Sequence, residues 1–357
     1  MNILFVALEE SGKKISDKIL KDLDSQDLKH NYYSFGLDQQ ATSNIKEVNE
    51  IKIKPIMGFF QILKNLRYIF NLRKYMISLV EKFNIDHIFF IDSFDYSRFF
   101  YKKFNKIKFS QIVGPSVFIW KKNKAKFIND NFENIFSIFI ADRKYYNSNI
   151  YSYIGHPLST KVIPKKTNTY SIKNIGIFLG SRDQEVFNNL NIISNFIDNS
   201  LSYNYFFFTL PKYKTHINNH FSDNSKIHIY LNDNNYYSNI SKLDFAIACS
   251  GTVHLELSLS YIPHLIFYNT NFLNIFFFKF FIKTKFISLL NIFAEKEVIK
   301  EFLQSSFNSN SIKIYIDSIN NKNDLDNITN DLKKNVEKFN INYFDLSSVI
   351  DYLKKFS

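Results

Sequence analysis

Short apolar runs alternate with longer amphipathic segments in both halves of the chain. The runs are rich in Ile and Phe, and amphipathic segments such as 13–23, 58–83 and 186–197 lie between them. Parallel strands that are buried on both faces have runs of this kind, flanked by helices. The pattern therefore predicts an α/β fold with two doubly wound, Rossmann-like domains. The expected strands are 3–8, 32–35, 87–91, 109–113 and 135–141 in the first half, and 175–179, 205–210, 227–231, 245–249 and 264–268 in the second.

The pattern breaks at 157–171, where two Pro residues and a run of Lys, Thr and Asn interrupt it. A chain of 357 residues is also long for a single hydrophobic core. We therefore expect a first domain over residues 1–160 and a second over 170–335. The stretch from 327 to the end is expected to be helical, with an Asn-rich break near Asn340.

Composition narrows the class of partner. A formal net charge of +12 is compatible with an anionic lipid surface, an anionic substrate or nucleic acid, or with a codon bias toward Lys and Asn. The Lys residues are scattered and no nucleic-acid recognition module is present, which argues against nucleic acid. Cys249 is the only cysteine, so an internal disulfide is excluded and a reducing compartment is expected.

No segment has the form of a secretory signal or a membrane span. Residues 1–8 are apolar but lack a basic leader, which predicts a first buried strand. The aromatic segment 272–286 contains three Lys residues and is shorter than the ~20 apolar residues of a spanning helix. This segment and 55–83 mix basic with aromatic residues, which suits either an anionic bilayer face or a core helix with a basic polar face. The sequence predicts a soluble or interfacial protein.

Candidate site residues follow the ends of the expected strands. In open α/β sheets, ligands bind beyond the carboxyl ends of the strands, so the residues there form a list of candidates. Two facing sheets would bring these turns together at a shared cleft. The turns are Glu9-Glu10-Ser11-Gly12, Asp92 with Asp95, Gly114-Pro115-Ser116, Gly180-Ser181-Arg182 and Ser250-Gly251-Thr252.

The turn Ser250-Gly251-Thr252 joins an apolar strand to a helical pattern. The backbone N–H groups at a helix start, with the helix dipole, can bind an anion such as a diphosphate. Glu256, about one turn further, could accept hydrogen bonds from sugar hydroxyls. The alternative is an ordinary helix cap by Ser250 or Thr252, with Glu256 solvated.

Asp92 and Arg182 are candidates for the chemistry. Asp92 closes an apolar strand, where partial desolvation would raise its pKa toward that of a general base; a helix cap is the alternative. Asp95 suits a capping or positioning role. Arg182 follows a Gly turn and suits bidentate contact with phosphate, or is simply a surface residue.

Several common motifs are absent from the sequence. It has no P-loop and no G-x-G-x-x-G turn, which disfavours P-loop NTPases and dinucleotide oxidoreductases. It has no cluster with metal-ligand spacing and no G-x-S-x-G elbow. The remaining candidate is a transferase that uses a nucleotide-sugar donor.

Eight segments resemble, in order, the motifs of lipid-A-disaccharide synthase, an inverting glycosyltransferase family. The resemblance runs from Ile3 to about Gln304 with few gaps. Singly the motifs are weak, but eight in order on one chain are specific. They are 8–13 (L-E-E-S-G-K, compared with G-E-A-S-G-D), 55–58, 91–96 (I-D-S-F-D-Y, compared with I-D-A-P-D-F), 114–120, 154–158 (I-G-H-P-L), 180–185 (G-S-R-D-Q-E), 250–256 (S-G-T-V-H-L-E, compared with S-G-T-A-T-L-E) and 288–304.

The resemblance implies a GT-B fold, in which an acceptor-binding first domain and a UDP-sugar-binding second domain face a central cleft, and it implies no required metal or cofactor. It implies UDP-2,3-diacylglucosamine as donor, 2,3-diacylglucosamine 1-phosphate (lipid X) as acceptor and a new β(1→6) bond. A C-terminal helix at about 340–357 would pack back on the first domain. Because both substrates carry acyl chains, a peripheral place on the cytoplasmic face of the inner membrane follows. A homodimer is left open.

The resemblance also implies roles by position. Asp92 is the candidate base for the acceptor 6-hydroxyl. The acceptor side would include Ser11, Gly12, Asp95 and Ser116. The UDP-sugar would be held by Ser181, Arg182, Glu185, Ser250, Gly251, Thr252, Glu256 on the ribose, and Asn291.

The chain departs from the motifs at Leu8, Lys13 and Leu290, where the family has Gly, Asp and Pro. It also departs at 295–296, where this chain has Glu-Lys and the family has Gly-Arg. Three alternatives stay open. The chain could be another UDP-sugar transferase of the same fold, a UDP-N-acetylglucosamine epimerase, or a drifted relative that binds lipid without catalysis.

Overall fold

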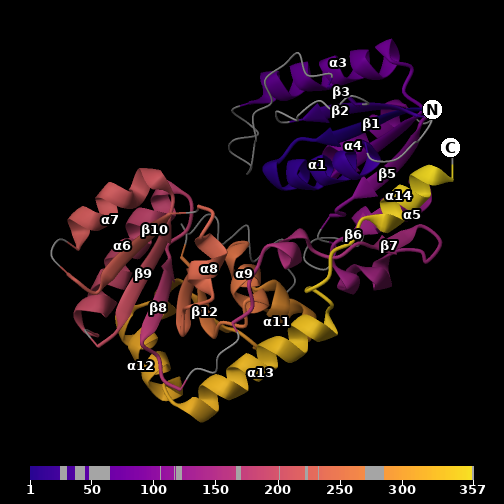
Figure 1. Ribbon diagram of the computed structural model, residues 1–357. Coiled ribbons are helices and arrows are strands. Elements are labelled where there is room, and N and C mark those ends of the chain that lie inside the picture. Colours follow the sequence, from indigo (N-terminus) through magenta and orange to yellow (C-terminus); the bar gives the residue numbers. More distant parts are fainter. Residues whose placement is uncertain are drawn as a thin grey trace. The chain divides into compact units, whose positions relative to one another are not determined.

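The computed structural model describes residues 1–24, 30–36, 45–47, 65–104, 106–115, 117, 123–165, 170–200, 202–221, 224–231, 233–269 and 285–355. They form two compact units (Figure 1). Unit 1 comprises Met1–Pro157 with Tyr343–Ser357, and unit 2 comprises Leu158–Asn342. Each unit contains one parallel sheet with helices on both faces, so the predicted α/β class is confirmed.

The sheet of unit 1 has the strand order β3-β2-β1-β4-β5-β6-β7. The chain leaves β1 for one side of the sheet and later continues from β4 on the other, so the strand order reverses between β1 and β4. The strands are β1 (Asn2–Ala7), β2 (Asn31–Gly36), β3 (Ile45–Glu47), β4 (His87–Ile91), β5 (Lys108–Ile112), β6 (Asn134–Ser137) and β7 (Tyr151–Tyr153). The helices are α1 (Glu10–Asp24), α3 (Leu66–Lys82), α4 (Phe94–Lys103), α5 (Asn123–Asn131), α14 (Ser347–Lys354) and the 3₁₀ helices η1 (Ile140–Tyr145) and η2 (Pro157–Thr160), the last of which runs into unit 2.

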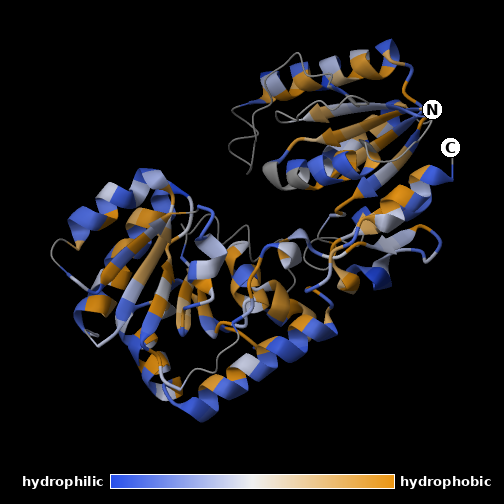
Figure 2. Ribbon diagram, viewed as in Figure 1, coloured by the Kyte–Doolittle hydropathy of each residue, from blue (hydrophilic) through white to orange (hydrophobic). Residues whose placement is uncertain are grey.

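Alternating residues of β1 divide the core of unit 1 into two layers. Ile3 and Phe5 face a layer that contains α1 and α14, whereas Leu4 and Val6 face α3, α4 and α5. Because successive side chains of a strand point to opposite faces, a strand covered on both sides must be apolar throughout. Figure 2 shows this as strands and inner helix faces of high hydropathy.

The C-terminal segment completes unit 1. This segment crosses the chain at 154–156, where Gly155 has φ +75°. There the His156 N–H donates to the Tyr343 carbonyl (2.8 Å), and the Asp345 N–H donates to the Ile154 carbonyl (2.8 Å). The helix that follows, α14, then buries four apolar side chains in the core with β1 and α1: Leu346 at its start, Val349, Ile350 and Leu353. The last helix is therefore an integral layer of unit 1.

The sheet of unit 2 has the order β10-β9-β8-β11-β12-β13, so its strand order reverses between β8 and β11. One face packs on α6, α7 and α12, and the other on α8 and α9. The strands are β8 (Asn174–Phe178), β9 (Asn204–Thr209), β10 (Ile227–Leu231), β11 (Phe245–Cys249), β12 (His264–Tyr268) and β13 (Lys300–Leu303). The helices are α6 (Asp183–Asp198), α7 (Lys214–His220), α8 (Tyr236–Ile240), α9 (Val253–Leu259), α11 (Leu289–Ala294), α12 (Ser309–Ile319), α13 (Lys322–Lys338) and the 3₁₀ helices η3 (Pro211–Tyr213) and η4 (Gln304–Ser306).

Within the described part of the chain, no helix has the length and apolar character needed to cross a membrane. Most of the aromatic segment at 272–286 lies outside the described residues, as does 55–64 of the segment 55–83. The remainder of the latter is residue 65, α3 and Phe83.

Candidate active site

Asp92 lies where β4 ends, beside the point at which the strand order of unit 1 reverses. Its N–H donates to the Ile112 carbonyl (2.8 Å), and the Gln111 side chain donates to its carbonyl (2.7 Å), so β5 holds the turn on both sides. Asp92 (φ 61°) and Ser93 (φ 52°) are both left-handed. Such backbone costs about 1–3 kcal/mol per residue and is concentrated at functional sites.

Glu9 stands beside Asp92. It follows β1, the neighbour of β4 in the sheet. Burial raises the pKa of Asp92, although the Ser93 N–H that donates to its carboxylate (2.8 Å) lowers it. Burial, and then the charge of Asp92, raise the pKa of Glu9. Carboxylates whose pKa is raised by burial, as both of these are, suit proton transfer nearer to neutral pH. Glu9 was in the predicted turn but not among the predicted site residues; only the strand-end position pointed to it.

Gly12 allows α1 to approach the end of β4. A Cβ at this position would lie 3.0 Å from the Ile91 carbonyl oxygen, so a larger residue would push the helix away from Asp92. Asp95, in the first turn of α4, is exposed and pairs with Lys124 (3.3 Å). Ser11 lies in α1, but its side chain is outside the described residues, as is Ser116.

In unit 2, the turn after β8 is closed by Glu185. One carboxylate oxygen accepts from the N–H groups of Ser181 (3.2 Å) and Arg182 (3.3 Å), and the other pairs with the Arg182 guanidinium (2.5 Å). Gly180 has φ +108°, and a Cβ there would lie 2.6 Å from the Glu185 carboxylate. Glu185 thus takes the place that an anion would need on these two amides. The Arg182 side chain is 70% exposed, so the guanidinium is the group that this turn offers to a phosphate.

The turn Ser250-Gly251-Thr252 follows β11 and leads into α9. The first internal hydrogen bonds of α9 are those from Leu255 and Glu256 to the Thr252 carbonyl, so the amides before Leu255 precede the helical ladder. α9 has only 7 residues, which favours individual amides over a long helix dipole as the binding groups. A Cβ at Gly251 would meet open space, with only the carbonyl oxygen of Cys249 at 4.0 Å.

Two tyrosines of α8 hold Glu256. The Tyr236 hydroxyl donates to one carboxylate oxygen (2.9 Å) and the Tyr237 hydroxyl to the other (3.2 Å). Burial, followed by the charge of Glu256, raises the pKa of Tyr236 well above its usual value, so the phenol stays a donor. The predicted ribose-binding carboxylate is therefore fixed in orientation.

Asn291 is fully engaged within the protein. Its amide nitrogen donates to the Ile299 carbonyl (2.7 Å) and to Glu301 (2.7 Å), and its amide oxygen accepts from the N–H groups of Val298 and Ile299 (2.8 Å each). An amide side chain has two donors and two acceptor sites, so none is left for a ligand in this arrangement. Asn291 therefore positions the segment around α11, and Glu301, which sequence reasoning missed, is its partner.

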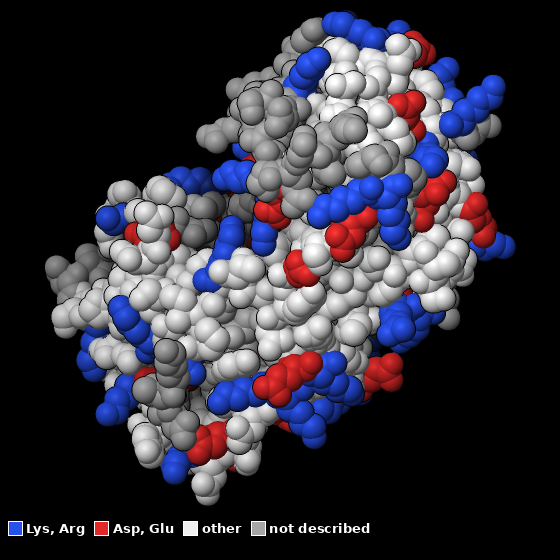
Figure 3. Space-filling model, turned by 45° about the vertical axis from the view of Figure 1, so that its right-hand side comes forward, with Lys and Arg blue, Asp and Glu red and all other residues white. Residues whose placement is uncertain are grey.

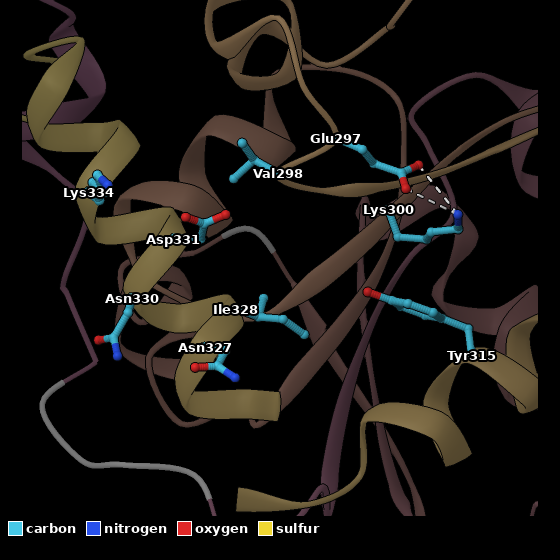
Figure 4. Close-up of a pocket in the computed structure, with 9 residues that line it drawn as sticks. All are labelled: Glu297, Val298, Lys300, Tyr315, Asn327, Ile328, Asn330, Asp331 and Lys334. Atoms are coloured by element: carbon cyan, nitrogen blue, oxygen red, sulfur yellow. Dashed lines mark hydrogen bonds and ion pairs between the residues drawn. The ribbon is translucent and has the colours of Figure 1, made fainter. Parts of the chain in front are cut away.

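A pocket of about 590 Å³ lies elsewhere in unit 2 (Figure 4). Its walls come from the residues before β13, from α12 and from α13, and Glu297 pairs with Lys300 (3.2 Å) on one side. No predicted site residue lines it. Because it lies by the amino end of β13, it is at the sheet edge opposite to the one where α/β proteins bind ligands.

The described residues contain no group of three or more His, Cys, Asp or Glu side chains that could hold a metal ion. Cys249 is buried, and its burial raises its pKa to about 12, so the thiolate needed for a nucleophile is disfavoured.

The family model for lipid-A-disaccharide synthetase matches residues 3–344. The chain belongs to the lipid-A-disaccharide synthetase family. It is 28% identical over 337 residues to the lipid-A-disaccharide synthase of Wigglesworthia glossinidia brevipalpis, covering 86% of each chain. It is 26% identical to lipid-A-disaccharide synthase 1 of Legionella pneumophila (strain Lens), covering 97% of this chain and 95% of the relative.

Among solved structures, MurG of Acinetobacter baumannii aligns over 99% of each chain with a TM-score of 0.56 and 12% identity, which is a likeness of fold. The predicted GT-B fold and family are thereby confirmed, and so is the class of enzyme, a glycosyltransferase of lipid A biosynthesis.

Proposed function

We propose that this chain transfers 2,3-diacylglucosamine from UDP-2,3-diacylglucosamine to the 6-hydroxyl of 2,3-diacylglucosamine 1-phosphate. The hydroxyl oxygen bonds to C1 of the donor sugar, its proton passes to a base, and the C1–O bond to the diphosphate breaks with inversion. The products are the β(1→6) disaccharide 1-phosphate and UDP. The family membership supports the reaction, and the setting of Asp92 supports the base.

Asp92 is the base in this proposal. It is a carboxylate at a strand end, its pKa is raised by burial, and its turn is held by β5 in left-handed backbone. Glu9 lies beside this base, and burial followed by the charge of Asp92 raises the pKa of Glu9. A base whose pKa lies closer to the working pH transfers protons more effectively.

The donor side of the proposal belongs to unit 2. Arg182 would bind the diphosphate, the amides of the Ser250–Thr252 turn would accept its growing charge, and Glu256 would bind the ribose hydroxyls. Preorganised donors stabilise a leaving group because they need no reorientation as its charge develops. The proposal requires that these groups and Asp92 act on one pair of substrates.

Binding to an anionic bilayer is part of the proposal, since both substrates carry acyl chains, and we place it at the cytoplasmic face of the inner membrane. On α3, Leu66 is 56% exposed and Phe70 is 59% exposed, with the Lys74 ammonium 5.0 Å from the Phe70 ring. Apolar side chains that are interspersed with cations suit an anionic interface. In the view of Figure 3, Lys and Arg are scattered among Asp and Glu and do not form the continuous stripe of a nucleic-acid site.

The membrane proposal is tested by sedimentation with vesicles of anionic and neutral phospholipids. The double variant Leu66→Ser, Phe70→Ser should bind anionic vesicles less, whereas Ile314→Ser, at an equally exposed position of unit 2 (60%), should bind like the wild type. Equal recovery of the wild type in the supernatant with and without anionic lipid would reject it.

Turnover is tested with Asp92→Asn. The assay follows UDP release and disaccharide formation from the acylated donor and acceptor, with an unacylated acceptor in parallel. Asp92→Asn should lower kcat by about 10²- to 10⁴-fold, the range for loss of a general base. Asp130→Asn, at an exposed carboxylate of α5, serves as the control.

Other outcomes decide between the alternatives. Wild-type activity that survives Asp92→Asn would remove Asp92 from the role of base. UDP release with equal use of the unacylated acceptor would favour another UDP-sugar transferase. Binding of lipid without disaccharide would identify a noncatalytic relative.

A further inference from the structure

His254 occupies the turn where the donor diphosphate is proposed to bind. It is the second residue of α9, directly after the Ser250–Thr252 turn, and only 4% of it is exposed. Nδ1 lies 2.5 Å from the Gly251 carbonyl oxygen, and Nε2 lies 3.2 Å from the Leu289 N–H.

These two contacts fix the tautomer. A backbone N–H can only donate, so Nε2 must accept from Leu289 and carry no proton. A carbonyl can only accept, so Nδ1 carries the proton and donates it to Gly251. Burial lowers the pKa of His254 to about 4, so the ring is neutral and keeps this arrangement at neutral pH. The titratable group that interacts with it from β12 is His264, which burial also keeps neutral.

The bond to Gly251 sets the direction of the next amide. A trans peptide is planar, and its C=O and N–H point in opposite directions. The Gly251 carbonyl is drawn toward the buried imidazole. The N–H of the same peptide, which belongs to Thr252, is therefore directed away from that imidazole. Without the imidazole, the Gly251 carbonyl would lose the hydrogen bond that it accepts, and a glycine backbone, which has no Cβ, has more freedom to rotate than that of any other residue.

The bond to Leu289 ties the turn to a rigid segment. Leu289 begins α11, and the two residues before it donate their N–H groups to Glu301 (2.9 Å each). Asn291 links the same segment to Glu301 and to the start of β13. These buried hydrogen bonds hold the His254 ring in place, and the ring in turn holds the Gly251 carbonyl.

We propose that His254 is a positioning residue for the UDP donor: through Gly251 it aims the Thr252 N–H at the diphosphate, and through Leu289 it couples that turn to the Asn291–Glu301 network. This inference rests on the proposed function. In this proposal, the contact of His254 with Gly251 matters for binding of the donor, and the contact of His254 with Leu289 stabilises α11.

Three substitutions separate these two contacts. His254→Asn keeps a donor near the position of Nδ1, His254→Gln places its amide near Nε2, and His254→Leu removes both contacts while it keeps an apolar side chain. Binding of UDP is measured by calorimetry, kcat and donor KM by UDP release, and folding by urea denaturation. His264→Gln, which changes an equally buried histidine of unit 2 that bonds to its own strand connection (Ile262 carbonyl, 2.7 Å), controls for loss of stability.

His254→Leu and His254→Gln should weaken UDP binding and lower kcat/KM by about 10- to 100-fold, the scale of one preorganised donor to a charged group. His254→Asn should stay within about 3-fold of the wild type, less than the change expected for one neutral hydrogen bond. His264→Gln should bind UDP normally even where its urea midpoint is lower.

The outcomes distinguish this inference from the function on which it rests. If the wild type binds UDP and His254→Leu binds it equally well, the positioning role is wrong and the proposed function stands. If Asn and Leu variants lose binding alike, or in proportion to lost stability, the role of Nδ1 is wrong. If the wild type binds no UDP, the donor site and this inference fail together.

Discussion

Gly155→Ala tests how tightly the C-terminal segment is fastened to unit 1. A Cβ at this position would lie 2.0 Å from the Tyr343 carbonyl oxygen and 2.5 Å from its carbon. Both are backbone atoms, so no side-chain rotation relieves the overlap. Gly155 also has φ +75°, which L-residues other than Gly rarely adopt.

The magnitude follows from these two effects. Left-handed backbone costs a residue with a Cβ about 1–2 kcal/mol. Relieving the overlap requires a shift of the strand-like crossing, which would break the bonds from His156 to Tyr343 and from Asp345 to Ile154, each contributing about 1 kcal/mol. We therefore expect Gly155→Ala to lower the free energy of unfolding of unit 1 by about 3–4 kcal/mol.

The assay is urea denaturation together with hydrogen exchange of the amides of α14. Exchange should accelerate in α14, because the crossing fixes the helix on the sheet, while the amides of β8 and β11 in unit 2 exchange as in the wild type. Gly251→Ala is the control for stability, since only one atom lies within 4.0 Å of its added Cβ. An unchanged urea midpoint and unchanged exchange in α14 would refute the reasoning.

Three further predictions concern buried polar groups. Burial lowers the pKa of His87 to about 3 in the folded state, whereas the unfolded chain binds this proton once the pH falls below about 6.5. Lowering the pH therefore favours unfolding of the wild type. Between pH 7.5 and 5.5 the free energy of unfolding of the wild type, measured by urea denaturation, should fall by about 1.4 kcal/mol more than that of His87→Gln. Lys165→Met should cost about 1–3 kcal/mol, because it leaves the partly buried Asp244 carboxylate without its 2.9 Å partner; an unchanged urea midpoint would contradict this. Tyr236→Phe should raise the donor KM about 5-fold with little change in kcat, because Glu256 loses the hydrogen bond that the Tyr236 hydroxyl donates; an unchanged donor KM would show that this bond does not matter.

The sequence determined the class of fold because buried parallel strands leave a local signature. The runs at 87–91 and 245–249 coincide with β4 and β11, and each is apolar because helices cover both faces. The short strands β3, β7 and β13 were not predicted, since three or four residues at or near the edge of a sheet carry no such pattern. The run at 135–141 was only partly right: β6 ends at Ser137, and a 3₁₀ helix begins at Ile140.

The sequence also placed Asp92 and the Ser250–Thr252 turn at strand ends, because the order of strand, turn and helix follows from the local pattern of apolar and polar residues. Only the tertiary structure decided what these residues contact. Glu9 lies beside Asp92 because β1 and β4 are neighbours, Glu185 folds back onto its own turn, and His254 joins Gly251 to a residue 35 positions away. Periodicity is a local property, whereas a hydrogen-bond partner depends on which distant segments pack together, and that is the physical reason for the division.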